Sequence, residues 1–232
     1  MYPKLLTIDC VAEIIIVNND SANTPDWLVP HKKVRIIDHG KNIYVNPAWN
    51  QAVAESKFDR ICLLSDDVEC HPDLFSIVHR DLTAKVGVIG PHVINFKPKE
   101  KKLRADYLRY MPTEAPYPIQ PPFGCLMFVH KDSWHPIPEE FKIYYGDTFL
   151  CSYNYCVLQR LNHYFVGIDL HTTWGTTSKS KEFSEFVMKE HMLRAKVFSK
   201  YIPQRIWKEI SAEAMAKDVS LDAATLDRLT HK

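Results

Sequence analysis

The chain has 232 residues, of which 46% are hydrophobic, and its 29 Lys and Arg almost balance its 28 Asp and Glu, giving a net charge of +1. This apolar content is typical of a folded protein and excludes a disordered chain. The balanced charge excludes nucleic-acid binding through bulk positive charge and leaves only a local basic patch open.

Taken in chain order, the first half alternates strands and helices. Short aliphatic runs predict buried strands, and Asn46-Pro47 and Pro72 predict the starts of two helices. The expected elements are strands at 13–17, 34–37, 61–64 and 86–89 and helices at 46–57 and 72–84. Strands separated by helices of this length predict a mostly parallel α/β sheet with helices on both faces.

The second half is less regular. Residues 97–122 are rich in lysine and proline and predict an excursion of loops, followed by elements whose patterns are clearer. These are strands at 125–129 and 164–168, a helix at 147–163, and a helical pattern from Lys181 to the end. We therefore expect a main α/β domain over 1–180 and a helical C-terminal extension over 181–232 packed on it.

The sequence also bears on compartment. No apolar run approaches the roughly 18 residues of a membrane-spanning helix, and the first residues lack the pattern of a signal peptide. The six cysteines form no Cys-X-X-Cys pair, and most lie in apolar runs. This usage is typical of buried, reduced thiols, so we expect a cytoplasmic protein without a transmembrane segment.

Polar clusters follow the first three predicted strands, at 18–21, Asp38-His39 and Asp66-Asp67. Ligands of such sheets bind beyond the carboxyl ends of the strands. Two adjacent carboxylates after a buried strand favour a hard divalent cation that also binds phosphate oxygens. The alternative is a solvated turn whose acids cap the next helix.

Five segments together resemble the glycosyltransferase family 2 group of nucleotide-sugar transferases. They read EIIIVNNDS, KNIYVNPAWNQAVAES, DRICLLSDDVECHPDLF, KVGVIGP and FGCLMFVHKDSWHPIPEEFKIYYGD. The resemblance covers roughly residues 13–180 and implies a GT-A fold, a Rossmann-like mixed sheet that is mostly parallel. It implies a metal-dependent, inverting transfer of a sugar from a nucleoside-diphosphate sugar to an acceptor hydroxyl, with Mn²⁺ or Mg²⁺ as the metal.

The resemblance implies a donor site of named residues. Asp67 falls at the metal-binding position, and Asp66 at the position that contacts the ribose or the metal's water. Asn18 falls at the base-binding position, with Asn19 and Asp20 beside it. The family usually has an acid where this chain has Asn18, which leaves the nucleotide base open.

The resemblance also implies a catalytic base and a third metal ligand, and the residues themselves offer further candidates. Asp147 falls at the position of the base that deprotonates the acceptor, or it caps the helix that starts there. His171 is implied as a third metal ligand, or as a hydrogen-bonded loop histidine. Asn42 and Asn50 contact the nucleotide or, equally, satisfy backbone groups. If Asp147 is not the base, Asp169 and Glu140 are the next candidates. Trp134 and Tyr145 could stack on an acceptor sugar or pack in the core.

One departure keeps other functions open. Family domains usually begin with a further strand and helix, and only 12 residues precede Glu13. Either the chain starts at an internal methionine or its nucleotide pocket is reduced. The alternative function is therefore a non-catalytic nucleotide-sugar-binding or scaffold protein, and then a nucleotidyltransferase, which the lack of a glycine-rich phosphate loop disfavours. The acceptor is open among a glycan, a small molecule and modified nucleic acid, and so is the oligomeric state.

Overall fold

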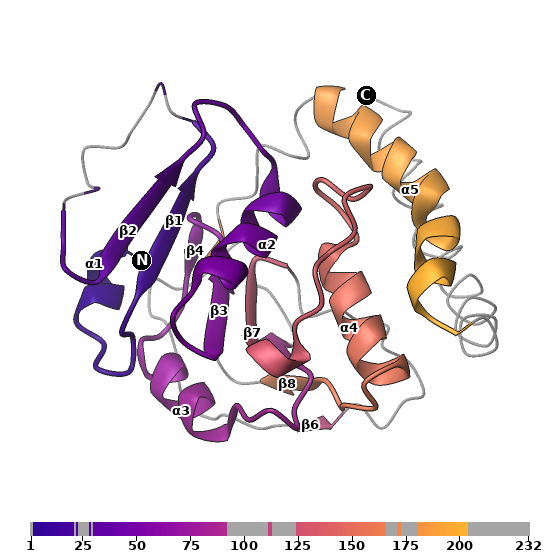
Figure 1. Cartoon of the computed structure of the whole chain (residues 1–232). Helices are drawn as coiled ribbons and strands as arrows, with labels where there is room; N and C mark the ends of the chain where they lie inside the picture. Colours follow the sequence, from indigo (N-terminus) through magenta and orange to yellow (C-terminus); the bar gives the residue numbers. More distant parts are fainter. Residues whose placement is uncertain are drawn as a thin grey trace.

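A computed structural model describes residues 2–20, 22, 28, 30–91, 111–112, 124–165, 171–172 and 181–203 of the chain (Figure 1). The helices are α1 (Tyr2–Leu6), α2 (Val45–Glu55), α3 (Asp73–Asp81), a 3₁₀ turn (Lys131–Ser133), α4 (Gly146–Cys156) and α5 (Lys181–Tyr201). The strands are β1 (Ile14–Asn18), β2 (Val34–Asp38), β3 (Arg60–Leu64), β4 (Val68–Glu69), β5 (Val88–Pro91), β6 (Met111–Pro112), β7 (Leu126–His130), β8 (His163–Phe165) and β9 (His171–Thr172).

These strands form three sheets. Strands β1 and β2 pair in parallel, a five-stranded sheet has the order β3-β7-β5-β8-β6, and β4 pairs with β9. Within the five-stranded sheet β7 runs antiparallel to both β3 and β5, and only the β5–β8 pair is parallel. The mixed α/β class is confirmed, but the expectation of mostly parallel pairing is wrong for the described strands. Fully apolar strands look alike in sequence whether their neighbours run parallel or antiparallel, so the pattern could not show where β7 inserts.

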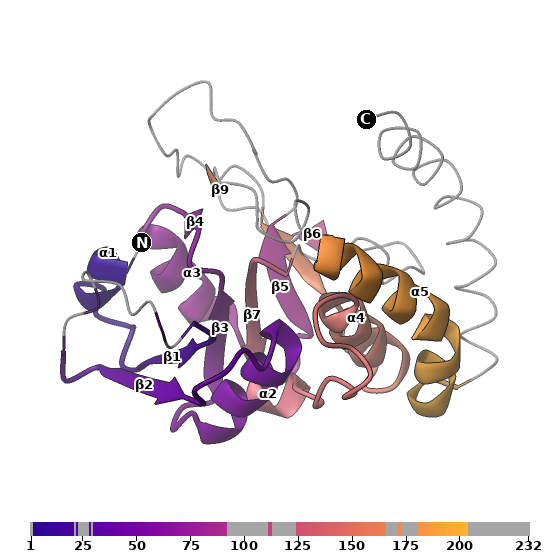
Figure 2. The ribbon, with the colours of Figure 1, turned by 90° about the horizontal axis from the view of Figure 1, so that it is seen from above.

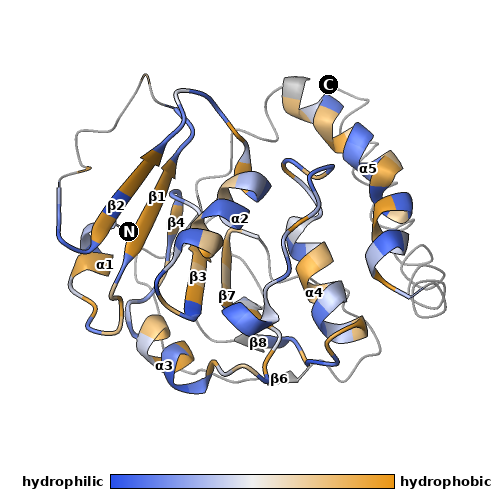
Figure 3. Cartoon of the chain, viewed as in Figure 1, coloured by the Kyte–Doolittle hydropathy of each residue, from blue (hydrophilic) through white to orange (hydrophobic). Residues whose placement is uncertain are grey.

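The five-stranded sheet lies between two layers of helices (Figure 2). Successive side chains of a strand point to opposite faces. Accordingly Leu126 and Phe128 of β7 pack in a cluster with α1 and α3, while Met127 packs in a second cluster with α2, α4 and α5. Strands β1, β2 and β3 are mostly hydrophobic along their length (Figure 3). Burial of each large apolar side chain in these clusters contributes about 1.5–3 kcal/mol.

Helix α5 completes the second cluster. Its Val197 and Phe198 are at most 1% exposed. The Phe198 ring lies 5.8 Å from Phe141 and 5.7 Å from Phe149 of α4, centre to centre. The helix predicted from Lys181 is confirmed as far as Tyr201, whereas residues 204–232 lie outside the described residues.

The helix boundaries differ from the prediction in an informative way. The Asn46-Pro47 pair predicts a helix that starts with Asn46 as its cap, but α2 begins at Val45 with Tyr44 in the capping position at φ 68°. Asn46 is instead fully buried, and its amide nitrogen donates to the carbonyl oxygens of Phe141 at 3.3 Å and Tyr144 at 3.0 Å. The sequence shows an asparagine before a proline, which is typical of a cap, and gives no sign of this distant partner.

Helix α4 also ends earlier than predicted, at Cys156 rather than residue 163. The predicted strand at 164–168 starts at His163, and its last residues lie outside the described part of the chain. The other predicted elements are confirmed to within about two to three residues at each end, which is the usual uncertainty of such boundaries.

The close contact between Asn46 and the start of α4 predicts that adding a methyl group at Gly146 destabilises the fold. A Cβ at Gly146 would overlap Oδ1 of Asn46, whose side-chain amide is held in place by the hydrogen bonds of its nitrogen. We expect Gly146→Ala to destabilise the fold by about 1–3 kcal/mol, the usual cost of overpacking, as measured by urea unfolding. Gly40→Ala is the control, because Gly40 has a positive φ of +66° and nothing within 4 Å of its Cβ position, so the cost there is about 1 kcal/mol. A smaller cost for Gly146→Ala than for Gly40→Ala would contradict the packing described.

Candidate active site

The carboxyl ends of β1 and β2 carry a loop that polar side chains hold together. The amide nitrogen of Asn18 donates to the carboxylate of Asp38 at 3.1 Å, and its amide oxygen accepts from the backbone N–H of Asp20 at 3.1 Å. Asn19 accepts from the N–H of Ile43 at 3.0 Å, which ties the loop to the segment before α2. This edge therefore presents two amides and a carboxylate together.

Asp38 belongs to one of the polar clusters predicted at the strand ends, but the sequence analysis gave it no role of its own. The parallel register sets Asn18 opposite Asp38. A carboxylate thus lies beside the position where the family resemblance led us to expect an acid. The signal in the sequence was that both aliphatic runs end in a polar residue, but only the strand pairing shows that the two side chains meet.

Asn42 and Asn50 make local hydrogen bonds. Asn42 accepts from the N–H of Tyr44 at 2.7 Å. Asn50 uses both ends of its amide on Ile137, donating to its carbonyl oxygen and accepting from its N–H, both at 2.8 Å. These bonds are those of the structural alternative, and a nucleotide contact by either side chain stays a prediction.

The acidic pair lies in the turn after β3. The N–H of Ser65 donates to the carbonyl oxygen of Cys125 at 2.8 Å, and the N–H of Val68 closes the turn onto the carbonyl oxygen of Ser65 at 3.2 Å. Asp66 is exposed and Asp67 is half-buried. Carboxylates in this position can take a cation from solvent without the large desolvation cost of two buried charges.

Strand β4 brings a distant part of the chain to this turn. It pairs antiparallel with β9, in a register that sets Glu69 opposite His171. The backbone of His171 is therefore close to the acidic turn, although about a hundred residues separate them in sequence. Across the part of the chain that the structure describes, no group of three or more His, Cys, Asp or Glu side chains is already arranged around a metal position.

Asp147 is the second residue of α4 and is half-buried. Its Oδ2 accepts from the N–H of Gly124 at 3.1 Å, and its Oδ1 accepts from the N–H of Thr148 at 2.7 Å. The surrounding protein atoms shield the carboxyl from solvent, and this desolvation raises its pKa above the ordinary value of 3.8, although both hydrogen bonds oppose the shift. A carboxyl group with a raised pKa is a common form of general base.

Cys125 connects the two acids. Burial, with smaller contributions from the negative charges of Asp67 and Asp147, raises the pKa of its thiol to about 12. The backbone shows the same connection, because the carbonyl oxygen of Cys125 accepts from the N–H of Ser65 and the N–H of Gly124 donates to Asp147. The adjacent Gly124 leaves little room, since a Cβ there would lie 2.9 Å from the ring of Trp49 and 3.4 Å from Asp147. The start of β7 therefore brings together the acid after β3 and the acid at the start of α4.

The loop before Asp147 has a strained conformation. Tyr145 has φ 62° and ψ 1°, in the left-handed region that non-glycine residues rarely adopt. Its hydroxyl lies 2.7 Å from Nδ1 of His191, and the guanidinium of Arg194 lies 5.3 Å from its ring centre. Such strain persists where neighbouring contacts hold it and is concentrated at functional sites.

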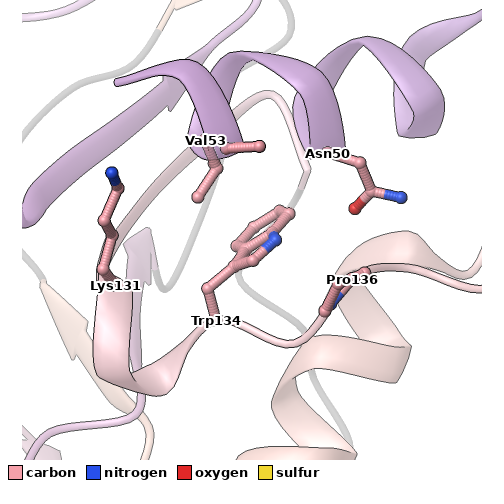
Figure 4. Close-up of a pocket in the computed structure, with 6 residues that line it drawn as sticks. Asn50, Val53, Lys131, Trp134 and Pro136 are labelled. Carbon is pink, nitrogen blue, oxygen red and sulfur yellow. The ribbon is translucent and has the colours of Figure 1, made fainter. Parts of the chain in front are cut away.

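Trp134, considered as a sugar platform, lines a separate groove of about 330 Å³ (Figure 4). It lies between the 3₁₀ turn and α2, together with Lys131 and Asn50. The N–H of Lys131 donates to the carbonyl oxygen of Asp59, so this groove is at the amino end of β3, away from the acidic turn.

The reserve candidates for the base are placed less well. Glu140 accepts from the ammonium of Lys200 at 2.6 Å, and this hydrogen bond lowers the pKa of its carboxyl, which disfavours proton abstraction. Asp169 lies outside the described residues. The loop before Asp147, residues 141–144, is held by the side chains of Asn46 and Glu190, which both bind its backbone. The sequence analysis did not identify this function of either residue.

Comparison with known families gives the class of protein. The profile of glycosyl transferase family 2 matches residues 8–136, more than half of the chain. The chain therefore belongs to glycosyl transferase family 2 and is a glycosyltransferase, whose donor is a nucleotide-sugar. No curated protein matches the sequence significantly. The matched region includes the loop after β1 and the acidic turn but ends before Asp147 and His171, so it gives no support to the roles predicted for these two residues.

Membership of the family implies a GT-A fold and, typically, a divalent metal. Within the described residues, no helix is both long and apolar enough to cross a membrane.

The environment of Asp147 predicts how stability depends on pH. Because the pKa of this carboxyl is higher in the folded chain than in the unfolded chain, the group adds stability as the pH falls through its folded pKa towards 3.8. An asparagine cannot titrate. We therefore expect the free energy of unfolding of the wild type, minus that of Asp147→Asn, to be larger near pH 4 than near pH 7 in urea unfolding. Asp73→Asn, which replaces an exposed acid on α3, is the control. A difference that does not change with pH would contradict the raised pKa.

Proposed function

We propose that this glycosyltransferase is metal-dependent and inverting, and that it moves a sugar from a nucleoside diphosphate to an acceptor hydroxyl. The observation that carries the proposal is that residues 124 and 125 contact both acidic segments: the carbonyl oxygen of Cys125 accepts from the N–H of Ser65 in the acidic turn, and the N–H of Gly124 donates to the carboxylate of Asp147. The acid proposed for the donor's metal, Asp67, and the acid proposed for the acceptor, Asp147, therefore belong to segments that both contact residues 124–125.

The donor set at the acidic turn fits a hard cation. Asp66 and Asp67 supply carboxylate oxygens, which Mn²⁺ and Mg²⁺ prefer. The pairing of β4 with β9 supports His171 as a further ligand, because it brings that residue's backbone next to the turn. The bound cation would stabilise the negative charge that develops on the departing diphosphate.

Asp147 would act on the acceptor. Its carboxylate takes the proton of the acceptor hydroxyl while the acceptor oxygen forms a bond to C1 of the sugar. The bond from C1 to the phosphate oxygen breaks, and its electron pair leaves with the nucleoside diphosphate. The hydrogen bonds from Gly124 to Oδ2 and from Thr148 to Oδ1 fix the carboxylate. Because Oδ1 accepts from both the N–H and the hydroxyl of Thr148, Oδ2 is the oxygen that we expect to take the proton. Attack opposite the leaving group inverts C1.

The loop after β1 is proposed as the base-binding part of the donor site. Asn18, Asn19 and Asp20 lie there with Asp38, whose carboxylate could accept a hydrogen bond from a ring N–H of the base. Asn42 and Asn50 would have only secondary parts, because their amides already bind backbone groups. The division at residue 180 is kept as a proposal, supported by the way α5 packs on α4 as a separate long helix.

Asp67→Ala tests the metal site. For the wild type, a thermal-shift screen of UDP-, GDP- and dTDP-sugars with Mn²⁺ should identify a stabilising ligand. At about 100 times its Kd, such a ligand adds about 2.7 kcal/mol. We expect Asp67→Ala to lose the Mn²⁺-dependent part of this stabilisation and to keep the melting temperature of the ligand-free protein.

The matched control is Asp73→Ala, which removes an exposed acid from α3 and should respond to Mn²⁺ like the wild type. His171→Ala should fall between the two if the histidine is a further ligand. An undiminished Mn²⁺ response in Asp67→Ala would remove Asp67 from the metal site.

Asp147→Asn tests the base. The variant keeps the size of the side chain and one acceptor for the helix N–H, so we expect it to bind donor and Mn²⁺ normally. Turnover should fall by about 10²-fold or more, the usual contribution of general-base catalysis, when nucleoside diphosphate release is followed with the ligand found in the screen. Normal turnover in this variant would make Asp147 a structural cap. Binding without turnover in the wild type would instead favour a binding protein.

A further inference from the structure

Glu190 is a buried acid on α5 that the proposed reaction does not use. Its side chain is 2% exposed. It lies on the apolar face of the helix, four residues after Phe186 and seven before Val197. Burying a carboxylate in such a place destabilises the fold unless several hydrogen-bond donors bind it.

The donors are three successive backbone N–H groups. Oε1 of Glu190 accepts from Lys142 at 2.6 Å and from Ile143 at 3.1 Å, and Oε2 accepts from Tyr144 at 2.7 Å. Consecutive N–H groups that converge on one anion form a strong binding concavity, and bonds to an ionised acceptor are roughly twice as strong as neutral ones. Glu190 therefore fixes the path of the backbone from 142 to 144.

The same loop is held from its other side. The amide nitrogen of Asn46 donates to the carbonyl oxygens of Phe141 and Tyr144. The N–H groups of the loop are thus held by α5 and its carbonyl groups by α2. Asp147 follows three residues after Tyr144, through the left-handed Tyr145 and the tightly packed Gly146. These two residues allow little adjustment, so a movement of the loop would be passed on to Asp147.

We infer that Glu190 is a positioning residue for sugar transfer: its carboxylate holds the backbone of residues 142–144 and thereby orients Asp147 toward the acceptor. The inference rests on the proposed role of Asp147. A misplacement of a reacting group by about 1 Å can lower a rate about 10²-fold, so the effect of losing this anchor should be measurable.

Glu190→Gln is the variant of choice. The glutamine keeps one oxygen acceptor but turns an NH₂ donor toward a backbone N–H, so the loop loses part of its anchor. Glu185→Gln, at an exposed position of the same helix, is the control. The reaction is hydrolysis of the sugar nucleotide that gives the largest Mn²⁺-dependent thermal shift, with water as the acceptor of the sugar. It is followed as nucleoside diphosphate release, below the melting temperature of each variant.

We expect Glu190→Gln to lower kcat by about 10- to 100-fold, with the KM for the donor and the Mn²⁺-dependent shift unchanged, while Glu185→Gln behaves as wild type. In the Asp147→Asn background, Glu190→Gln should cause no further loss, because both changes act on one group. A kcat equal to that of Glu185→Gln, a rise in donor KM alone, or the same fold loss in both backgrounds would overturn the inference.

The double variant also separates this inference from the proposed function. If Asp147→Asn alone keeps full turnover, the proposed base is wrong, whatever Glu190→Gln does. If Glu190→Gln does not fold, Glu190→Asp replaces it, since it keeps the charge but withdraws the carboxylate by one methylene. The same loss of kcat is then expected, and a wild-type kcat would overturn the inference.

Discussion

The position of β7 between β3 and β5 is the constraint on which the candidate site depends. Antiparallel pairing with both strands places the start of β7 beside the end of β3, where the N–H of Ser65 meets the carbonyl oxygen of Cys125. The preceding residue, Gly124, donates to the carboxylate of Asp147. The segment that enters β7 thus joins the acidic turn to the start of α4, and the lack of a side chain at Gly124 lets Trp49 and Asp147 approach its backbone closely.

The two sides of the site are supported differently, in keeping with their proposed roles. The acidic turn is held mainly by backbone pairing and leaves Asp66 exposed, as suits a site that takes up a cation and a charged donor from solvent. The Asp147 loop is held by the buried side chains of Asn46 and Glu190 from two helices. A group that must meet the acceptor in one geometry needs that rigidity.

Much of the element order could be predicted from the sequence, because buried aliphatic runs and proline starts are local signals. Local patterns also placed Asn18, Asp67 and Asp147 at the ends or starts of the right elements.

What the sequence could not show depends on pairing between distant segments. The antiparallel β7, the meeting of Asn18 with Asp38 and the burial of Asn46 are of this kind. For Glu190 the sequence shows only an acidic residue on the apolar face of a helix. That pattern indicates a buried acid but does not identify the loop that it binds.

The most direct measurement of the central claim is the anomalous scattering of Mn²⁺ in crystals soaked with Mn²⁺ and the nucleoside diphosphate of the stabilising donor. Our account predicts one ordered Mn²⁺ at the carboxylate of Asp67, with the diphosphate bound to it and the base at the loop of Asn18 and Asp38. The space beside the diphosphate should face Asp147. An ordered nucleotide whose Mn²⁺ is bound away from Asp67, or one bound at the Trp134 groove, would contradict the account.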